Sequence, residues 1–144
     1  MKKLLFGLLM ISTLSFSQEN VTITTKKSQI IYVDGEVEDV LKLVNSDDTK
    51  KRNIVYGEST DFFDFKNMKS FFKMGDREVS LDILKVEEKN GFLHVYCDDI
   101  NMITKNKMIT HIIININNDK NFPLMLYHFY WEHNDTTYVE ITLD

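Results

Sequence analysis

Strand-length apolar runs separated by short polar turns fill the C-terminal half of the chain, and this pattern constrains the fold more than any other feature. The runs cover residues 79–88, 92–98, 107–117, 122–133 and 136–143. Asn90-Gly91 separates the first two runs, and this dipeptide strongly favours a two-residue hairpin turn. Because short connections join neighbouring antiparallel strands, the pattern predicts a five-stranded antiparallel meander.

The N-terminal half of the chain is less regular. Residues 21–25 and 30–33 are typical of two short strands around a polar turn at 26–28, and residues 53–56 are typical of a further short strand. Residues 62–74 are rich in phenylalanine and fit either a short helix or two short strands. We expect these phenylalanines to be core residues in both cases.

Apolar residues at helical spacing follow the first predicted strands. Val37, Val40, Leu41 and Val44 alternate with acidic residues, which predicts a short amphipathic helix with acids in its first turn. Together with the meander, this predicts a mainly β fold with one short N-terminal helix. The meander would form part of a barrel, a sandwich or a curled sheet, and the alternative is an α+β fold.

The first 17 residues have the three-part layout of a secretory signal peptide. Lys2 and Lys3 precede an uncharged apolar run at 4–14, and small residues flank position 16. The run is too short to span a bilayer, which takes about 20 residues. We therefore expect cleavage after residue 17, a single globular β-rich domain over residues 18–144, a secreted or periplasmic location, and no stable membrane span.

Charge and cysteine content narrow the function classes. The net charge of −5 at pH 7 becomes −7 once Lys2 and Lys3 are removed, and basic residues do not gather in one stretch. Since phosphate neutralisation needs a basic surface, we expect no nucleic-acid partner. Cys97 is the single cysteine, so stability must come from core burial rather than from an internal disulfide.

Three of the four histidines are spaced 17 residues apart. If each hairpin is symmetric about the middle of its turn, Glu87 faces His94, His94 faces His111, and His111 faces His128 on adjacent strands. The four side chains would then form a row on one face of the sheet. A single-residue bulge within 98–106 would move His94 to the other face and break the row.

Both faces of the predicted meander are apolar and aromatic in its middle strands. The opposite face carries Leu93, Val95, Cys97, Ile112, Tyr127, Phe129 and Trp131. A sheet with water on one side alternates apolar with polar residues, so we expect both faces to be covered. On the last hairpin, Ile141 would face His128.

The histidine face is the candidate ligand site. Its members are Phe92, Tyr96, His111, Leu126, His128 and Tyr130. The first hypothesis is a non-enzymatic binding protein that holds a small apolar ligand or a partner protein on this aromatic face. The second is a structural or interaction domain in which both faces are simply core. Neither hypothesis assigns a catalytic residue.

A metal site is the third hypothesis. Glu87, His94, His111 and His128 have the side chains that zinc accepts, in a metal-binding protein or a metal-dependent enzyme. The same row could instead be a pH-responsive pocket, since histidine titrates near pH 6.5, or an equal spacing that arose by chance. Possible zinc is the only cofactor predicted, and an enzyme is the less favoured class.

Overall fold

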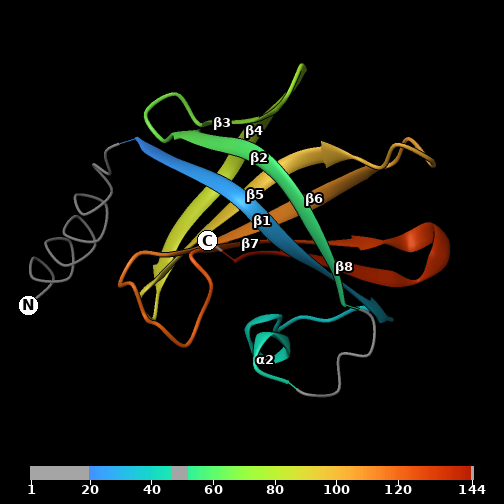
Figure 1. Ribbon diagram of the computed structural model, residues 1–144. Helices are drawn as coiled ribbons and strands as arrows, with labels where there is room; N and C mark the ends of the chain where they lie inside the picture. The colour runs from blue at the N-terminus through green and yellow to red at the C-terminus, as the bar shows by residue number, and fades with distance from the viewer. Residues whose placement is uncertain (1–19, 47–51, 144) are drawn as a thin grey trace, which may run out of the picture.

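The computed structural model describes residues 20–46 and 52–143, so the predicted signal peptide at 1–17 lies outside the described residues. Within these ranges the chain forms one closed barrel of antiparallel strands that follow one another in sequence order (Figure 1). The strands are β1 (Val21–Asp34), β2 (Arg52–Asp64), β3 (Lys69–Met74), β4 (Arg77–Lys89), β5 (Phe92–Ile100), β6 (Lys107–Asn115), β7 (Met125–Trp131) and β8 (Thr136–Thr142).

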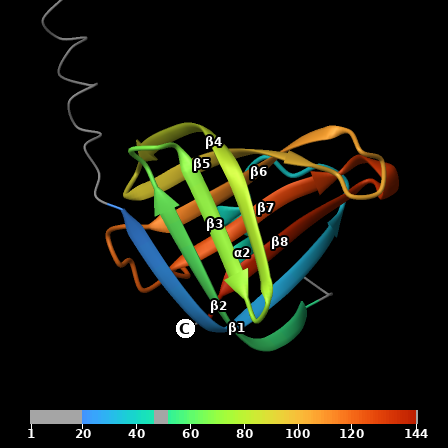
Figure 2. The ribbon, with the colours of Figure 1, turned by 90° about the horizontal axis from the view of Figure 1, so that it is seen from above.

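Closure of the barrel depends on β1, which pairs with a neighbour on each side. Gln29 of β1 lies opposite Ile54 of β2 and opposite Ile141 of β8. Figure 2 shows the sheet curling until its first and last strands meet. Because the first and last strands pair with each other, neither end of the sheet is left as a free edge strand. The predicted five-stranded meander is confirmed as β4–β8, and the mainly β class is confirmed in its barrel form rather than as α+β.

The Asn90-Gly91 turn between β4 and β5 has the geometry that its sequence predicts. Asn90 has φ 53° and Gly91 has φ 83°, and two consecutive positive φ values define the tight turn that matches strand twist. A side chain at Gly91 would also meet the amide of Asn117, because an added Cβ would lie 2.4 Å from its Nδ2.

The two short strands predicted at 21–25 and 30–33 are in fact one continuous strand, β1. Its register with β2 shifts between Thr25 and Lys27, so the polar residues that indicated a turn form a bulge. β4 has a similar shift between Ile83 and Lys85. Such bulges bend a strand and increase its twist, which long strands need when they wrap around a small barrel.

The ambiguous segment 62–74 forms a hairpin between β2 and β3. Phe62 lies opposite Phe71 across this hairpin, with ring centroids 6.0 Å apart. The strand predicted at 53–56 is the first part of β2. Not all of the phenylalanines are core residues, since Phe63 is fully buried while Phe62, Phe71 and others are half-buried.

The predicted amphipathic helix is much shorter than its spacing indicates. α2 (Leu41–Val44) has four residues and no acidic residue in its first turn, and a 3-10 turn, η1 (Glu132–Asn134), joins β7 to β8. Residues 35–37 lie outside the helix, held against β8 by hydrogen bonds. Thr137 Oγ1 donates to the Gly35 carbonyl (2.6 Å) and accepts from the Val37 amide (3.1 Å).

Apolar cores lie on both sides of the sheet, as predicted. The inner core closes one end of the barrel and contains Ile23, Phe63, Ile83, Leu93, Val95, Cys97, Ile112, Ile114 and Met125. The outer core lies between the barrel and the segment that contains α2, which Figure 1 shows outside the barrel. It contains Ile31, Val40, Phe92, Ile113, Leu126, Val139 and Ile141.

No helix in the described part of the chain combines the length and the apolar character needed to cross a bilayer.

Candidate functional site

The histidine row lies on the outer surface of the barrel. Leu93 and Val95 belong to the inner core, so His94, between them, points outward, because successive residues of a strand face opposite sides. Glu87 lies opposite His94, and His111 lies opposite His128, as the sequence predicts. The row therefore exists, but on the side of the sheet that faces α2 and solvent.

Two details of the predicted register are wrong, each by two residues. Tyr96 rather than His94 lies opposite His111, and Val139 rather than Ile141 lies opposite His128. A shift of two residues keeps every side chain on its own face, whereas a shift of one would not. The histidines consequently stay on one surface.

The β5–β6 loop explains the first shift. The Asn101 side chain folds over the loop, and its Oδ1 accepts hydrogen bonds from the backbone amides of Ile103 (2.9 Å) and Thr104 (3.1 Å). The Asn101 amide in turn donates to the Asn106 carbonyl (2.9 Å). These bonds centre the turn one residue later than simple symmetry predicts. At the last hairpin, η1 and the left-handed Asp135 have the opposite effect.

The rings of the row touch one another in sequence. His94 Nδ1 and His111 Nε2 lie 2.9 Å apart in a hydrogen bond, and the His111 ring stacks on Tyr96 at 4.4 Å between centroids. The Tyr96 hydroxyl donates to Glu87 Oε1 (3.1 Å). The His128 ring lies 5.8 Å from that of His111 between centroids, and both of its nitrogens are buried, with no hydrogen bond of ordinary geometry to any described residue.

Burial lowers the pKa of all three histidines. The pKa of His111 falls to about 4, first through desolvation and then through the positive charges that His94 and His128 would carry. Desolvation lowers the pKa of His128 against an opposing effect of the Val37 backbone, and lowers that of His94 against the charge of Glu87. The three histidines are therefore neutral at pH 7.

The arrangement of the row bears on the predicted zinc site. Neutral imidazoles are the form that binds metals. The nitrogens His94 Nδ1 and His111 Nε2 already lie close together. Across residues 20–46 and 52–143, however, the structure holds no group of three or more His, Cys, Asp or Glu side chains arranged to bind a metal ion. The Glu87 carboxylate is bonded to Tyr96 and to Lys85 Nζ (2.6 Å). The zinc site stays a prediction.

The predicted ligand face divides into two parts. Phe92 and Leu126 are 8% and 1% exposed and belong to the outer core beneath the α2 segment. The other four members line an open groove of about 400 Å³, which we call the histidine groove. It is lined by Glu36, Tyr96, Lys107, Met108, Ile109, His111, His128, Phe129, Tyr130 and Glu132.

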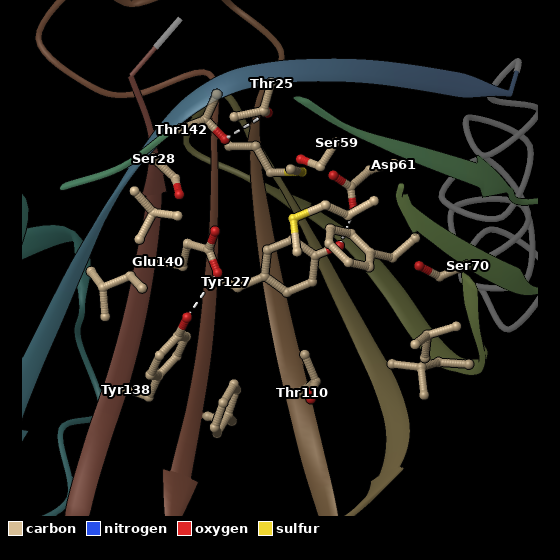
Figure 3. Close-up of a pocket in the computed structure, with 18 of the residues that line it drawn as sticks. Thr25, Ser28, Ser59, Asp61, Ser70, Thr110, Tyr127, Tyr138, Glu140 and Thr142 are labelled. Carbon is tan, nitrogen blue, oxygen red and sulfur yellow. Dashed lines mark hydrogen bonds between the residues drawn. The ribbon is translucent and has the colours of Figure 1, made fainter. Parts of the chain in front are cut away.

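A larger cavity of about 470 Å³ lies inside the barrel, and we call it the lumen. Its lining includes the exposed residues Val55, Met74 and Arg77, so the lumen reaches solvent where β2 begins and where β3 turns into β4. The inner core closes the opposite end. Figure 3 shows the polar side chains that project from the surrounding strands into this space.

Asp61 is the most deeply buried ionisable group of the lumen, at 1% exposure. It accepts a short hydrogen bond from the Tyr127 hydroxyl. Burial raises the pKa of Asp61 to about 6, the Tyr127 hydrogen bond opposes this rise, and the charge of Glu140 adds to it. The same surroundings raise the pKa of Tyr127 well above its ordinary value.

Two further carboxylates of the lumen are also bonded to hydroxyl groups. The Tyr138 hydroxyl donates to Glu140 Oε2 (2.8 Å), and Thr110 Oγ1 donates to Asp99 Oδ2 (2.7 Å). Additional hydroxyl side chains surround these pairs, namely Thr25, Ser28, Ser59, Ser70 and Thr142. This part of the lumen is a polar wall that carries negative charge.

Aromatic rings of β7 and β8 form a second wall of the lumen. Phe129 stacks on Tyr138, with centroids 4.6 Å apart and planes 16° apart. Trp131 lies 5.2 Å from Phe129 and 5.5 Å from Tyr138 between centroids. The lumen thus combines an aromatic surface with a hydrogen-bonding surface.

Sequence reasoning missed the lumen as a site. It placed Tyr127, Phe129 and Trp131 together on the face opposite the histidines and expected that face to be covered, but it did not assign a ligand site to it. The available signal was the polar residues on this face, such as Thr110 and Glu140, within otherwise apolar strands. Cys97 is a core residue as expected, and burial raises the pKa of its thiol to about 12.

No protein family, curated protein or solved structure matched the chain. The lumen and the histidine groove are therefore the two features of the molecule that bear on its function.

Proposed function

We propose that this protein is a non-enzymatic binding protein that holds one small, largely apolar molecule in the lumen of the barrel. The observation that carries the proposal is a cavity of about 470 Å³ with an aromatic wall, a polar wall and an opening to solvent. Typical small-molecule sites are concave, measure roughly 300–1,000 Å³, and combine apolar walls with a few convergent polar groups. The lumen has each of these properties.

The architecture favours the lumen over the histidine groove. A barrel of about eight strands has an interior wide enough either to be filled by side chains or to hold one small ligand. Here the inner core fills one end only. The histidine groove is smaller, at about 400 Å³, and Phe92 and Leu126 of the predicted ligand face do not line it, because they are buried in the outer core.

Export is part of the proposal. The signal-like features of residues 1–17 support a secreted or periplasmic protein that meets its ligand outside the cytoplasm. Mass spectrometry of the mature chain would test the cleavage position after residue 17.

The single tryptophan offers a direct test of ligand binding. Trp131 lines the lumen, and its emission overlaps the absorption of the neutral probe N-phenyl-1-naphthylamine. Titration should give saturable energy transfer from Trp131 to the probe with a stoichiometry of one. Absence of saturable transfer to this probe and to a series of neutral apolar compounds would contradict the proposal.

A lumen-filling variant locates the bound probe. Gly57 lines the mouth of the lumen, and an added Cβ there would meet only Met74 Sδ at 3.9 Å, so Gly57→Phe adds a ring without backbone strain. We expect Gly57→Phe to weaken probe binding by about tenfold or more, because the ring occupies the ligand's volume.

Glu58→Phe is the matched control for this variant. It adds the same ring at the next residue of β2, whose exposed side chain faces away from the lumen, so probe binding should not change. Loss of probe binding in His111→Ala but not in Gly57→Phe would indicate that the probe binds in the histidine groove instead. Equal binding in all four proteins would favour the structural or interaction domain.

A further inference from the structure

The charge of the lumen is strongly one-sided. Asp61, Asp99 and Glu140 place carboxylates in its wall, whereas Arg77 is the only cationic side chain among the described residues that line it. Arg77 is exposed at the mouth, while Asp61 is buried and Asp99 and Glu140 are half-buried. A ligand that moves past the mouth therefore enters a region of negative potential.

None of these three carboxylates forms an ion pair with a basic side chain in the described part of the chain. Asp61 and Glu140 each accept a hydrogen bond from a tyrosine hydroxyl, which is a neutral donor. The charge of Glu140 acts unfavourably on ionised Asp61, so the two groups repel one another across the lumen. Burying a charge without an opposite charge destabilises the folded state. Other interactions of the fold must therefore offset this unfavourable free energy.

A bound cation would reduce both the free energy of burying unpaired charge and the repulsion between Asp61 and Glu140. It would supply the missing opposite charge and would stand between two carboxylates that otherwise repel one another. The aromatic wall of Phe129, Trp131 and Tyr138 adds a second attraction, because the faces of aromatic rings attract ammonium groups. An organic amine with an apolar body fits the two walls together, whereas a carboxylate or phosphate ligand would be repelled.

We propose that the lumen selects an organic amine, with its protonated nitrogen beside Asp61 and Glu140 and its apolar body against the aromatic rings of β7 and β8. This inference rests on the proposed function, and it names the chemical class of the ligand. The ammonium donates hydrogen bonds to carboxylate oxygens that the tyrosine hydroxyls leave free, since each ionised carboxylate has about four acceptor positions.

Three naphthalene probes of the same size test the proposal. 1-Naphthylmethylamine is cationic at pH 7.5, 1-naphthylmethanol is neutral, and 1-naphthylacetate is anionic. Each is titrated against the wild-type protein loaded with N-phenyl-1-naphthylamine, so that displacement reports binding at the same place. We expect the amine to bind about tenfold or more tightly than the alcohol, and the acetate to bind most weakly.

Variants of the polar wall test which of its carboxylates cause the preference for the amine over the alcohol. Asp61→Asn should bring the amine close to the alcohol in affinity while the alcohol binds as before. Asp64→Asn is the control, because Asp64 lies on the same strand but its carboxylate lies at the surface, where it bonds to Asn67 instead of facing the lumen. Should Asp61→Asn not fold, the half-exposed Glu140→Gln provides the same comparison.

The outcomes separate the two proposals. If N-phenyl-1-naphthylamine binds in a Gly57-dependent manner but the alcohol or acetate binds at least as well as the amine, the charge preference is wrong and the binding function stands. An amine preference that survives both carboxylate variants would also overturn it. If no probe binds in the lumen, the binding function itself falls.

Discussion

The Tyr127 hydroxyl of β7 donates a hydrogen bond to the carboxylate of Asp61 on β2, 66 residues earlier in the chain and on another side of the barrel. The two groups meet inside the lumen, with Asp61 1% exposed. Because a buried carboxylate needs hydrogen-bond donors, this contact holds Asp61 in place and links β2 to β7 through the lumen.

Removal of this hydroxyl should destabilise the fold. Tyr127→Phe leaves the buried carboxylate of Asp61 without its tyrosine donor, and an unsatisfied buried group of this kind costs about 1–3 kcal/mol. We expect the free energy of unfolding in urea at pH 7.5 to fall by that amount. The pKa of Asp61 should also rise further, because the hydrogen bond from Tyr127 lowers it in the native protein.

Tyr130→Phe is the control for the Tyr127 variant. Tyr130 lies on the same strand and also donates its hydroxyl to an aspartate, Asp135 (2.7 Å), but this contact is exposed on the outer surface. Its loss should change the free energy of unfolding by less than about 0.5 kcal/mol. Equal losses in the two variants would show that the buried position of Asp61 has no special role.

Asp61 should give the protein a specific pH dependence. Its pKa rises from 3.8 to about 6 in the folded state, so between these values the folded chain binds a proton that the unfolded chain does not. Stability from this group therefore falls as pH rises from about 4 to 6, by about 3 kcal/mol in total. Below about pH 4 Asp61 is protonated in both states and does not destabilise the fold, and above about pH 6 the full destabilisation by the buried carboxylate is present.

Asp61→Asn should remove this contribution and raise the stability at pH 7.5. The amide is neutral, and its oxygen can still accept the Tyr127 hydrogen bond. The measurement is the free energy of unfolding in urea at several pH values between 4 and 7.5, taken as the difference between variant and wild type. A difference that does not grow with pH would contradict the raised pKa of Asp61.

The faces of the sheet were predictable because strand periodicity tolerates some errors. The register of the β5–β6 and β7–β8 hairpins was wrong by two residues, yet His94, His111 and His128 still share a face. Period-two alternation makes the face depend only on whether the shift is even. The hydrogen bonds of the Asn101 side chain determine the true centre of the first turn, and symmetry alone does not anticipate them.

The lumen was not predictable from local pattern. An apolar face such as that of Tyr127, Phe129 and Trp131 has the same sequence whether it packs solidly or borders a cavity. The difference depends on closure of the barrel by β1 and β8, residues more than 100 positions apart, of which Thr25 and Thr142 are an example. Asp61 lies between the predicted strand at 53–56 and the ambiguous segment 62–74, so its place in the polar wall could not be assigned.

The helix prediction failed for a reason that is also tertiary. Val37 and Val40 have helical spacing, but the hydrogen bonds of Thr137 to the backbone at 35 and 37 hold this part of the chain against β8, and the helix begins only at Leu41. Val40 is 1% exposed in the outer core. The apolar spacing thus predicted the burial of Val40 correctly, but it predicted the wrong backbone conformation for the residues before Leu41.

The zinc hypothesis has a consequence that can be measured on the intact protein. Zinc bound by His94 and His111 must replace the hydrogen bond between His94 Nδ1 and His111 Nε2, and binding to the folded state alone raises the melting temperature. Zinc should then raise the melting temperature of the wild type and not of His94→Gln. An equal response of the two proteins, or none, would exclude this site.

His111 should oppose Asp61 in the same pH range. Its pKa falls from 6.5 to about 4 in the folded state, so below pH 6.5 the unfolded chain takes up a proton that the folded chain excludes. Stability from this group is complete above pH 6.5 and falls by up to about 3 kcal/mol as pH drops to 4. His111→Gln should weaken this loss in urea unfolding across pH 4–7.5, whereas His133→Gln, at an exposed position, serves as the control. If the His111 variant loses as much stability on acidification as the wild type, the histidine row is not what makes the outer face sensitive to acid.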